Sequence, residues 1–431
     1  MIRPGAAAPP PTLPLRFLAA AVVAFLLAAL AVPWLASELA GHYYHPRLLA
    51  LTHTVTLGWI TLTIMGASYQ LIPVTLGRPI WGERLARWQF GLLVAGIAGM
   101  LGHFFVGQWS GLAWAAALVV LGAGLHVTNV ALSVRGLPAW TFTARLIVLA
   151  LAGLTLTALF GLLLALDRVV KFLPGQFFPT LHAHFHLALL GWVLPMIIGV
   201  AARVYPMFLL AEEPAGRGAP VQFWGLALGV PAVVAGLLGL RSLLVLGALA
   251  VAAAAGAHLY WVFGMLRTRR RPRLDVGLWF VLTGAAWLGP SVALGLGFAF
   301  DLLGGPRLAL AYAVLALGGW VSLTIAGMML KIVPFLVWYW VYAPRAGRSP
   351  VPTLAQLSWP AGERAAYVLL ATGIPALALA VAAGHPEWIR AAGLLLALGA
   401  LALAAALGRV LAHARPALAR ARTGGLPLAA A

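Results

Sequence analysis

Cysteine is absent from this sequence, and charged residues are scarce. Without thiolates the chain cannot form disulfides, thiolate metal sites, iron–sulfur clusters or covalently attached c-type haem. Only 9% of the residues are charged and 63% are hydrophobic, whereas a soluble globule needs a far more polar surface. The composition therefore predicts an all-α integral membrane protein, whose first partner is the lipid bilayer.

Acidic residues are the scarcest charged groups, and none of the nine lies in the middle of a hydrophobic run. A carrier driven by protons or sodium usually needs a carboxylate at mid-membrane. This absence makes ion-coupled transport a less favoured class of function.

Basic residues give the chain a net charge of +19, but they are concentrated in alternate loops, most densely from Arg267 to Arg273. This is the positive-inside pattern of a membrane protein, and it argues against a nucleic-acid partner. It predicts a protein of the bacterial cytoplasmic membrane with both termini in the cytoplasm.

Hydrophobic runs long enough to cross a bilayer need about 20 residues each. The sequence contains twelve, near residues 16–38, 47–74, 88–107, 113–133, 145–166, 180–208, 221–240, 242–266, 276–299, 308–338, 364–384 and 390–409.

A spaced pattern, G-W-x6-G-x6-P, occurs in the second, sixth and tenth of these spans. Its copies begin at Gly58, Gly191 and Gly319. The pattern predicts three four-helix repeats around a pseudo-threefold axis, with each glycine admitting a neighbouring backbone or a flat ligand and each proline ending its helix. The predicted parts are a disordered tail (1–15), the repeats (16–135, 142–273 and 275–413) and a basic cytoplasmic tail (414–431).

Histidines are concentrated near the predicted outer ends of these spans. His182, His184 and His186 lie on the sixth span, His53 lies on the second, and His103 ends the third. Neutral imidazole is the usual protein ligand of haem iron and of copper or zinc, and no other strong ligand is buried here. We expect at least two of His53, His182, His184 and His186 to bind a cofactor, and all five are candidate metal ligands.

The sixth span, HAHFHLALLGWVLPMIIGVAARVYP, resembles a histidine-bearing helix of subunit I in the heme-copper oxidase superfamily. The likeness is to C-family oxidases and nitric oxide reductases, and also to the NnrS family of twelve-span haem and copper proteins. The resemblance implies one or two b-type haems and leaves copper open. It also implies electron transfer or handling of nitric oxide or oxygen, with a donor such as cytochrome c or quinol.

Departures from the oxidase pattern limit this resemblance. Oxidases carry paired histidines on helix ten and copper ligands on helices six and seven, whereas here the tenth and seventh spans have no histidine. A proton-pumping oxidase is therefore disfavoured. Whether the protein is a nitric oxide or oxygen reductase-like enzyme or a non-enzymatic nitric oxide, haem or copper handling protein stays open.

Two ligand arrangements remain at this stage. A b-type haem could bridge His53 and either His184 or His186. Alternatively, the sixth span could carry the haem while His53 and His103 hold a metal opposite it. A third class of function, a metal transporter lined by histidine, would need neither haem nor an oxidase-like site.

Overall fold

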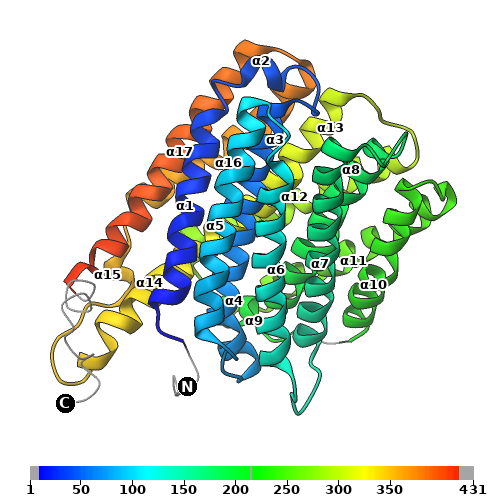
Figure 1. Cartoon of the computed structure of the whole chain (residues 1–431). Coiled ribbons are helices and arrows are strands. Elements are labelled where there is room, and N and C mark those ends of the chain that lie inside the picture. Colours follow the sequence, from blue (N-terminus) through cyan, green and yellow to red (C-terminus); the bar gives the residue numbers. More distant parts are fainter. Residues whose placement is uncertain (1–8, 214–215, 417–431) are drawn as a thin grey trace.

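The computed structural model describes residues 9–213 and 216–416, and every regular element in that part of the chain is a helix. Within these described residues, twelve helices are long and apolar enough to cross a membrane, which confirms the predicted number of spans. They form one bundle with their axes roughly along the vertical of Figure 1.

The first set of spans packs as one helix, a long helix carrying the G-W pattern, and a hairpin of two helices. Its elements are α1 (Thr12–Ala31), the short α2 (Ala36–Leu39), the continuous run α3 (Pro46–His53), η1 (Thr54–Thr61) and α4 (Leu62–Leu76), and the hairpin α5 (Glu83–Val106) and α6 (Leu112–Val134).

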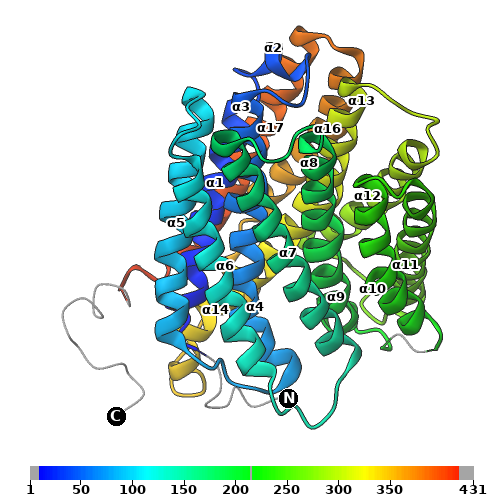
Figure 2. The ribbon, with the colours of Figure 1, turned by 45° about the vertical axis from the view of Figure 1, so that its right-hand side comes forward.

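The second set follows the same order of elements. It comprises α7 (Phe142–Val170), the run α8 (Phe177–His186), η2 (Leu187–Val193) and α9 (Leu194–Leu209), and the hairpin α10 (Gly218–Leu237) and α11 (Arg241–Thr268). Figure 2 shows this hairpin and the α5–α6 hairpin on opposite sides of the bundle.

The third set comprises α12 (Val276–Ala299), the run α13 (Pro306–Ala313), η3 (Val314–Ser322) and α14 (Leu323–Val341), the short η4 (Ala343–Arg345) and α15 (Leu354–Leu357), and the hairpin α16 (Pro360–Ala383) and α17 (Pro386–Ala412). The helices α3, α8 and α13 all lie at the upper end of the bundle in Figure 1, which we call the histidine end.

Three local predictions need correction or fall outside the described residues. The predicted tail 1–15 is too long, because α1 begins at Thr12 and tolerates Pro14 in its first turn, where proline loses no helical hydrogen bond. The patterned prolines do not end their helices at once: α14 continues past Pro334 to Val341. Residues 1–8 and 417–431, which carry most of the predicted tails, lie outside the described part.

Each long helix contains a π-helical segment at the same point of the pattern. η1 begins immediately after His53, η2 begins immediately after His186, and η3 begins immediately after Ala313; each segment includes the Gly-Trp pair. A π segment widens the turn to i→i+5 bonding and rotates the helix above it relative to the helix below. Such segments change the direction in which the side chains of α3, α8 and α13 point.

The patterned glycines admit neighbouring helices. A Cβ at Gly58 would overlap Ala24 of α1, and the backbone of Gly191 presses so closely on Gly153 of α7 that no side chain fits there. A Cβ at Gly319 would press on Trp287 of α12. These contacts let each long helix pack closely onto the first helix of its set.

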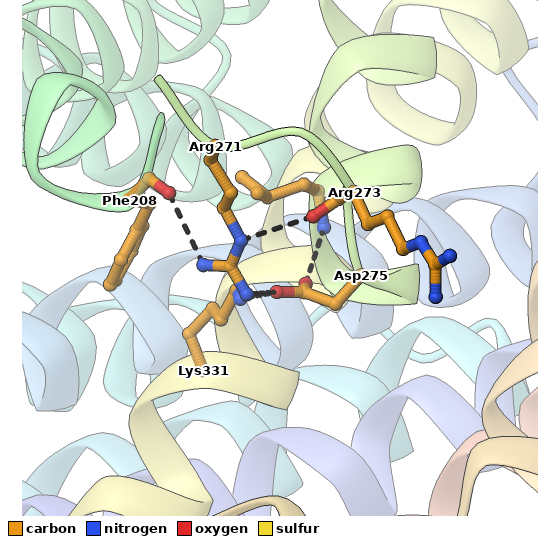
Figure 3. Close-up of polar contacts among 6 residues, drawn as sticks. Phe208, Arg271, Arg273, Asp275 and Lys331 are labelled. Carbon is orange, nitrogen blue, oxygen red and sulfur yellow. Dashed lines mark hydrogen bonds and ion pairs between the residues drawn. The ribbon is translucent and has the colours of Figure 1, made fainter. Parts of the chain in front are cut away.

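A half-buried ionic cluster lies at the end of the bundle opposite the histidine end (Figure 3). Asp275 caps α12 by accepting a hydrogen bond from the Leu278 backbone, and it forms ion pairs with Arg271 and with Lys331 of α14. Arg271 also donates to the Phe208 carbonyl at 3.3 Å. The cluster therefore connects α9, the loop after α11, α12 and α14, which explains why Lys331 is tolerated inside a hydrophobic helix.

Candidate functional site

A cavity lies between the first and second sets, and its lining includes residues at the histidine end such as Tyr44 and His53. Its empty volume is about 1030 Å³, including its mouth, and its walls come from η1, α5, α6, α7 and α8. Almost all of the lining side chains are apolar. The polar exceptions of interest are His53, His184 and Arg168.

His53 and His184 approach each other across this cavity. Their ring centroids are 6.5 Å apart and their ring planes differ by only 19°. His53 ends α3 and His184 lies on α8, so the two rings come from different sets. Gly161 of α7 makes room for the second ring, because a Cβ there would lie 3.0 Å from Cε1 of His184.

Backbone carbonyls determine which nitrogen of each ring is free. Nδ1 of His53 lies 2.8 Å from the Leu49 carbonyl oxygen, and Nδ1 of His184 lies 3.0 Å from the Thr157 carbonyl oxygen. A carbonyl only accepts, so both Nδ1 atoms carry the proton and both Nε2 atoms keep a lone pair. Among the described residues neither Nε2 has a hydrogen-bond partner, so both are available as ligands.

Arg168 lines the same cavity from the end of α7. Its guanidinium lies 4.3 Å from the ring centroid of Trp109, 5.7 Å from that of Phe177 and 6.0 Å from that of Tyr44, so cation–π contacts hold it in place. Its Nε is buried without a hydrogen-bond partner among the described residues. Burial raises the pKa of Tyr44, which keeps that phenol neutral beside the arginine. Arg168 is therefore a cationic group that this cavity would present to an anion.

The other three candidate histidines lie elsewhere. His186 points to the opposite side of α8 and lines a second cavity, between the second and third sets. Nε2 of His182 is hydrogen-bonded to the Tyr43 hydroxyl at 2.9 Å. The ring of His103 packs against Gly111 and does not line the cavity that contains His53.

Three-ligand metal sites do not occur in the described part of the chain: no group of three or more histidine, aspartate and glutamate side chains there could hold a metal ion. What the structure brings together is a pair of imidazoles in an apolar cavity.

No protein-family model and no curated protein matches this chain. The site must therefore be interpreted from its own geometry.

Sequence analysis did not identify Arg168 and Gly161 as site residues. A single arginine at a span end is usually a topology signal, and a glycine on an apolar helix face is common. One signal was present: Arg168 is one of the few basic residues at the end of the bundle where the histidines are concentrated.

Proposed function

We propose that this protein is a membrane haem protein in which a b-type haem iron is bound by His53 and His184, for electron transfer or for handling of nitric oxide or oxygen. The observation that carries the proposal is the facing pair of imidazoles, each with its Nδ1 proton bound to a carbonyl and its Nε2 free.

The separation of the two rings supports a shared metal. Both rings have a free Nε2 in the same cavity, and neutral imidazole would hold a metal through that atom with a metal–nitrogen bond of ~2.0 Å. The observed centroid separation is 6.5 Å. Carbonyl acceptors at Nδ1 fix the orientation of both rings and raise the basicity of Nε2, as is usual for metal-bound histidine.

The lining of the cavity supports haem over a bare ion. The apolar lining suits a large hydrophobic molecule, and Arg168 would pair with the carboxylates of such a group. A bound haem would supply reversible one-electron chemistry, while the protein sets ligation, access and polarity.

The three sets are proposed to be repeats about a pseudo-threefold axis, in the manner of heme-copper oxidase subunit I. The matching π segments and the matching order of elements support this, as does a cavity of about 610 Å³ that α4, α9 and α14 line together at the centre. On this proposal the haem lies at the boundary of the first two repeats.

The histidine end is proposed to face outward across the bacterial cytoplasmic membrane. The basic segment Arg267–Arg273 follows α11 at the opposite end, as the positive-inside rule expects of a cytoplasmic surface. An electron donor such as cytochrome c would then reach the haem from outside, or quinol would reach it from the bilayer.

A metal transporter is the rival function. It needs a series of ligand groups along a path through the membrane. The described acidic residues lie at or beside helix ends, such as Asp275 before α12 and Glu363 in the first turn of α16, and leave the centre of the bundle without a carboxylate. This arrangement favours the haem proposal.

The experiment is an absorption spectrum of the purified protein, oxidised and dithionite-reduced, with a pyridine haemochrome assay of haem content. We expect the narrow reduced bands of a six-coordinate b-type haem. His53→Ala and His184→Ala should each remove this species, and millimolar imidazole should restore part of it by filling the vacated space.

His182→Ala is the matched control, because it removes an imidazole from the same helix that already has a hydrogen-bond partner. Its six-coordinate spectrum should equal that of the wild type. A six-coordinate spectrum that survives both His53→Ala and His184→Ala would refute the proposed ligation.

A further inference from the structure

The basic segment Arg267–Arg273 carries more positive charge than the side chains around it neutralise. Five of its seven residues are arginine. Among the described residues, Arg271 is the only one of these arginines with an acidic partner, Asp275, and that carboxylate is shared with Lys331. The haem proposal makes no use of this charge, because the segment follows α11 at the end of the bundle opposite the histidine end.

Acidic side chains on the neighbouring loop leave most of this charge without a partner. Glu212 and Glu213 follow α9 in the chain. Glu213 forms its ion pair with Arg203, and Glu212 forms none among the described residues. One carboxylate therefore remains on this part of the surface against four unpaired arginines, so the surface attracts anions.

Backbone contacts hold the basic segment against the end of α9. The Arg270 N–H donates to the Leu210 carbonyl oxygen at 3.2 Å. The Arg271 N–H donates to the Leu209 carbonyl oxygen at 3.3 Å, and the Arg271 side chain donates to that of Phe208 at 3.3 Å. The segment is therefore a preformed surface, and binding of a ligand costs little entropy for ordering it.

The arginines on either side of Arg271 have free guanidinium groups. Arg270 and Arg273 are exposed, and neither guanidinium has a hydrogen-bond or ion-pair partner among the described residues. Figure 3 shows the Arg273 side chain directed away from Asp275. A guanidinium presents several N–H donors in one plane, which suits the oxygens of a phosphate.

An apolar stripe leads away from the basic segment along α11. Tyr260, Phe263 and Arg267 follow one another at spacings of three and four residues, so they share one face of this helix. The two rings are 75% and 52% exposed, and the Arg267 guanidinium lies 4.4 Å from the Phe263 ring centroid. Because α11 is long and apolar enough to span the membrane, these exposed rings would face lipid. Cations at the end of such a stripe suit a phosphate group joined to an acyl chain.

We propose that the basic segment and this stripe bind an anionic phospholipid, with its phosphate held by the unpaired arginines and an acyl chain along Phe263. In the orientation proposed above, this lipid belongs to the cytoplasmic leaflet. The inference goes beyond the haem function and depends on none of the residues of the haem site.

The test is native mass spectrometry of the full-length protein in detergent, with phosphatidylglycerol and phosphatidylcholine of identical acyl chains as probes. The wild type should bind phosphatidylglycerol more tightly. The double variant Arg270→Gln, Arg273→Gln should weaken that binding by ~10–30-fold, because each basic residue at such a surface contributes ~5-fold. Binding of phosphatidylcholine should not change. Neither side chain has a contact that the fold needs, so this variant should fold as the wild type does.

The double variant Arg84→Gln, Arg87→Gln is the matched control. It removes the same charge from two exposed arginines in the first turns of α5, which lies on the opposite side of the bundle from α11 (Figure 2). Salt screens charges at such a separation, so phosphatidylglycerol binding should stay within about twofold of the wild type. Equal losses in both double variants would mean that net charge alone attracts the lipid, and would overturn the site.

A second pair of variants distinguishes a phospholipid from a soluble anion. Phe263→Ala should weaken phosphatidylglycerol binding by ~3–10-fold, because part of the apolar surface under the acyl chain is lost. Leu246→Ala removes an exposed apolar side chain nearer the other end of α11 and should have no effect. Unchanged binding in Phe263→Ala, or a wild type without preference for phosphatidylglycerol, would overturn the proposal. The haem spectra of all four variants should equal that of the wild type, so this test is independent of the haem proposal.

Discussion

The cavity between the first and second sets and the cavity between the third and first sets are built by corresponding helices but lined by different side chains. The third cavity has an empty volume of about 840 Å³ and lies between α1, η1, η3, α16 and α17. Where the first cavity has His53 and His184, the third has Val314 and Leu51, at the corresponding distances from their glycines. It contains no histidine and no arginine.

This difference shows that the fold forms the cavities, whereas a few side chains set the ligands that each cavity offers. The packing of a long helix against the first helix of the next set leaves an apolar space at each of these boundaries between two sets. Two side chains on the turns before the π segment then decide its chemistry: two imidazoles, an imidazole with a phenol (His186 and Tyr312 in the second cavity), or two aliphatic groups. A site of this kind can be gained or lost without a change of fold.

Grafting the ligands into the third cavity is the strongest test of this comparison. The double variant Leu51→His, Val314→His should gain up to one further six-coordinate haem per chain, because both positions line one apolar cavity. Pyridine haemochrome content and low-spin electron paramagnetic resonance signals measure the gain.

The matched control is Leu51→Asn, Val314→Asn, which introduces polar groups of similar size that bind iron poorly. If the haem content of the His variant stays equal to that of the Asn variant, two histidines do not suffice to bind haem in the third cavity. The other lining side chains of the first cavity must then contribute to binding.

The arginine of the first cavity provides a second, smaller test. Arg168→Gln should speed haem loss by ~10–100-fold, because a hydrogen-bonded charge pair contributes about 1.5–3 kcal/mol and the third cavity has no such group. Transfer of haem to apomyoglobin measures the rate.

Lys171→Gln removes the same charge from the exposed residue that caps α7, and it should leave the rate within about twofold of wild type, as expected of a surface substitution. An equal effect of both substitutions would mean that general electrostatics, and not the position of Arg168 over the cavity, retains the haem.

The twelve spans could be predicted from the sequence because each is a long hydrophobic run. The histidines could be predicted as ligands because the spans contain few other ligand groups. Rotation about the helix axis could not be predicted. His184 and His186 are two residues apart, so they lie on nearly opposite faces, and the choice between them depends on packing across the bundle. The π segments, which no composition signal reveals, set that rotation.

Tyr312 could not be predicted as a cavity residue from the sequence. A lone tyrosine on an apolar helix is usually a packing residue, and nothing in the sequence sets Tyr312 apart from one. The position seven residues before the glycine of the G-W pattern, which His184 and Tyr312 occupy, pairs with the preceding set, and this pairing is visible only once the helices are placed side by side.

The smallest predicted effect concerns the space that admits the His184 ring. In Gly161→Ala the new Cβ would lie 3.0 Å from Cε1 of that ring, so the imidazole must tilt while remaining a ligand. We expect unchanged haem content, a shifted low-spin electron paramagnetic resonance spectrum and a modest change in reduction potential. Gly124→Ala is the control, because a Cβ there meets nothing within 4 Å and adds only helix propensity. Identical spectra for the two variants would mean that His184 is not held against α7 when the haem is bound.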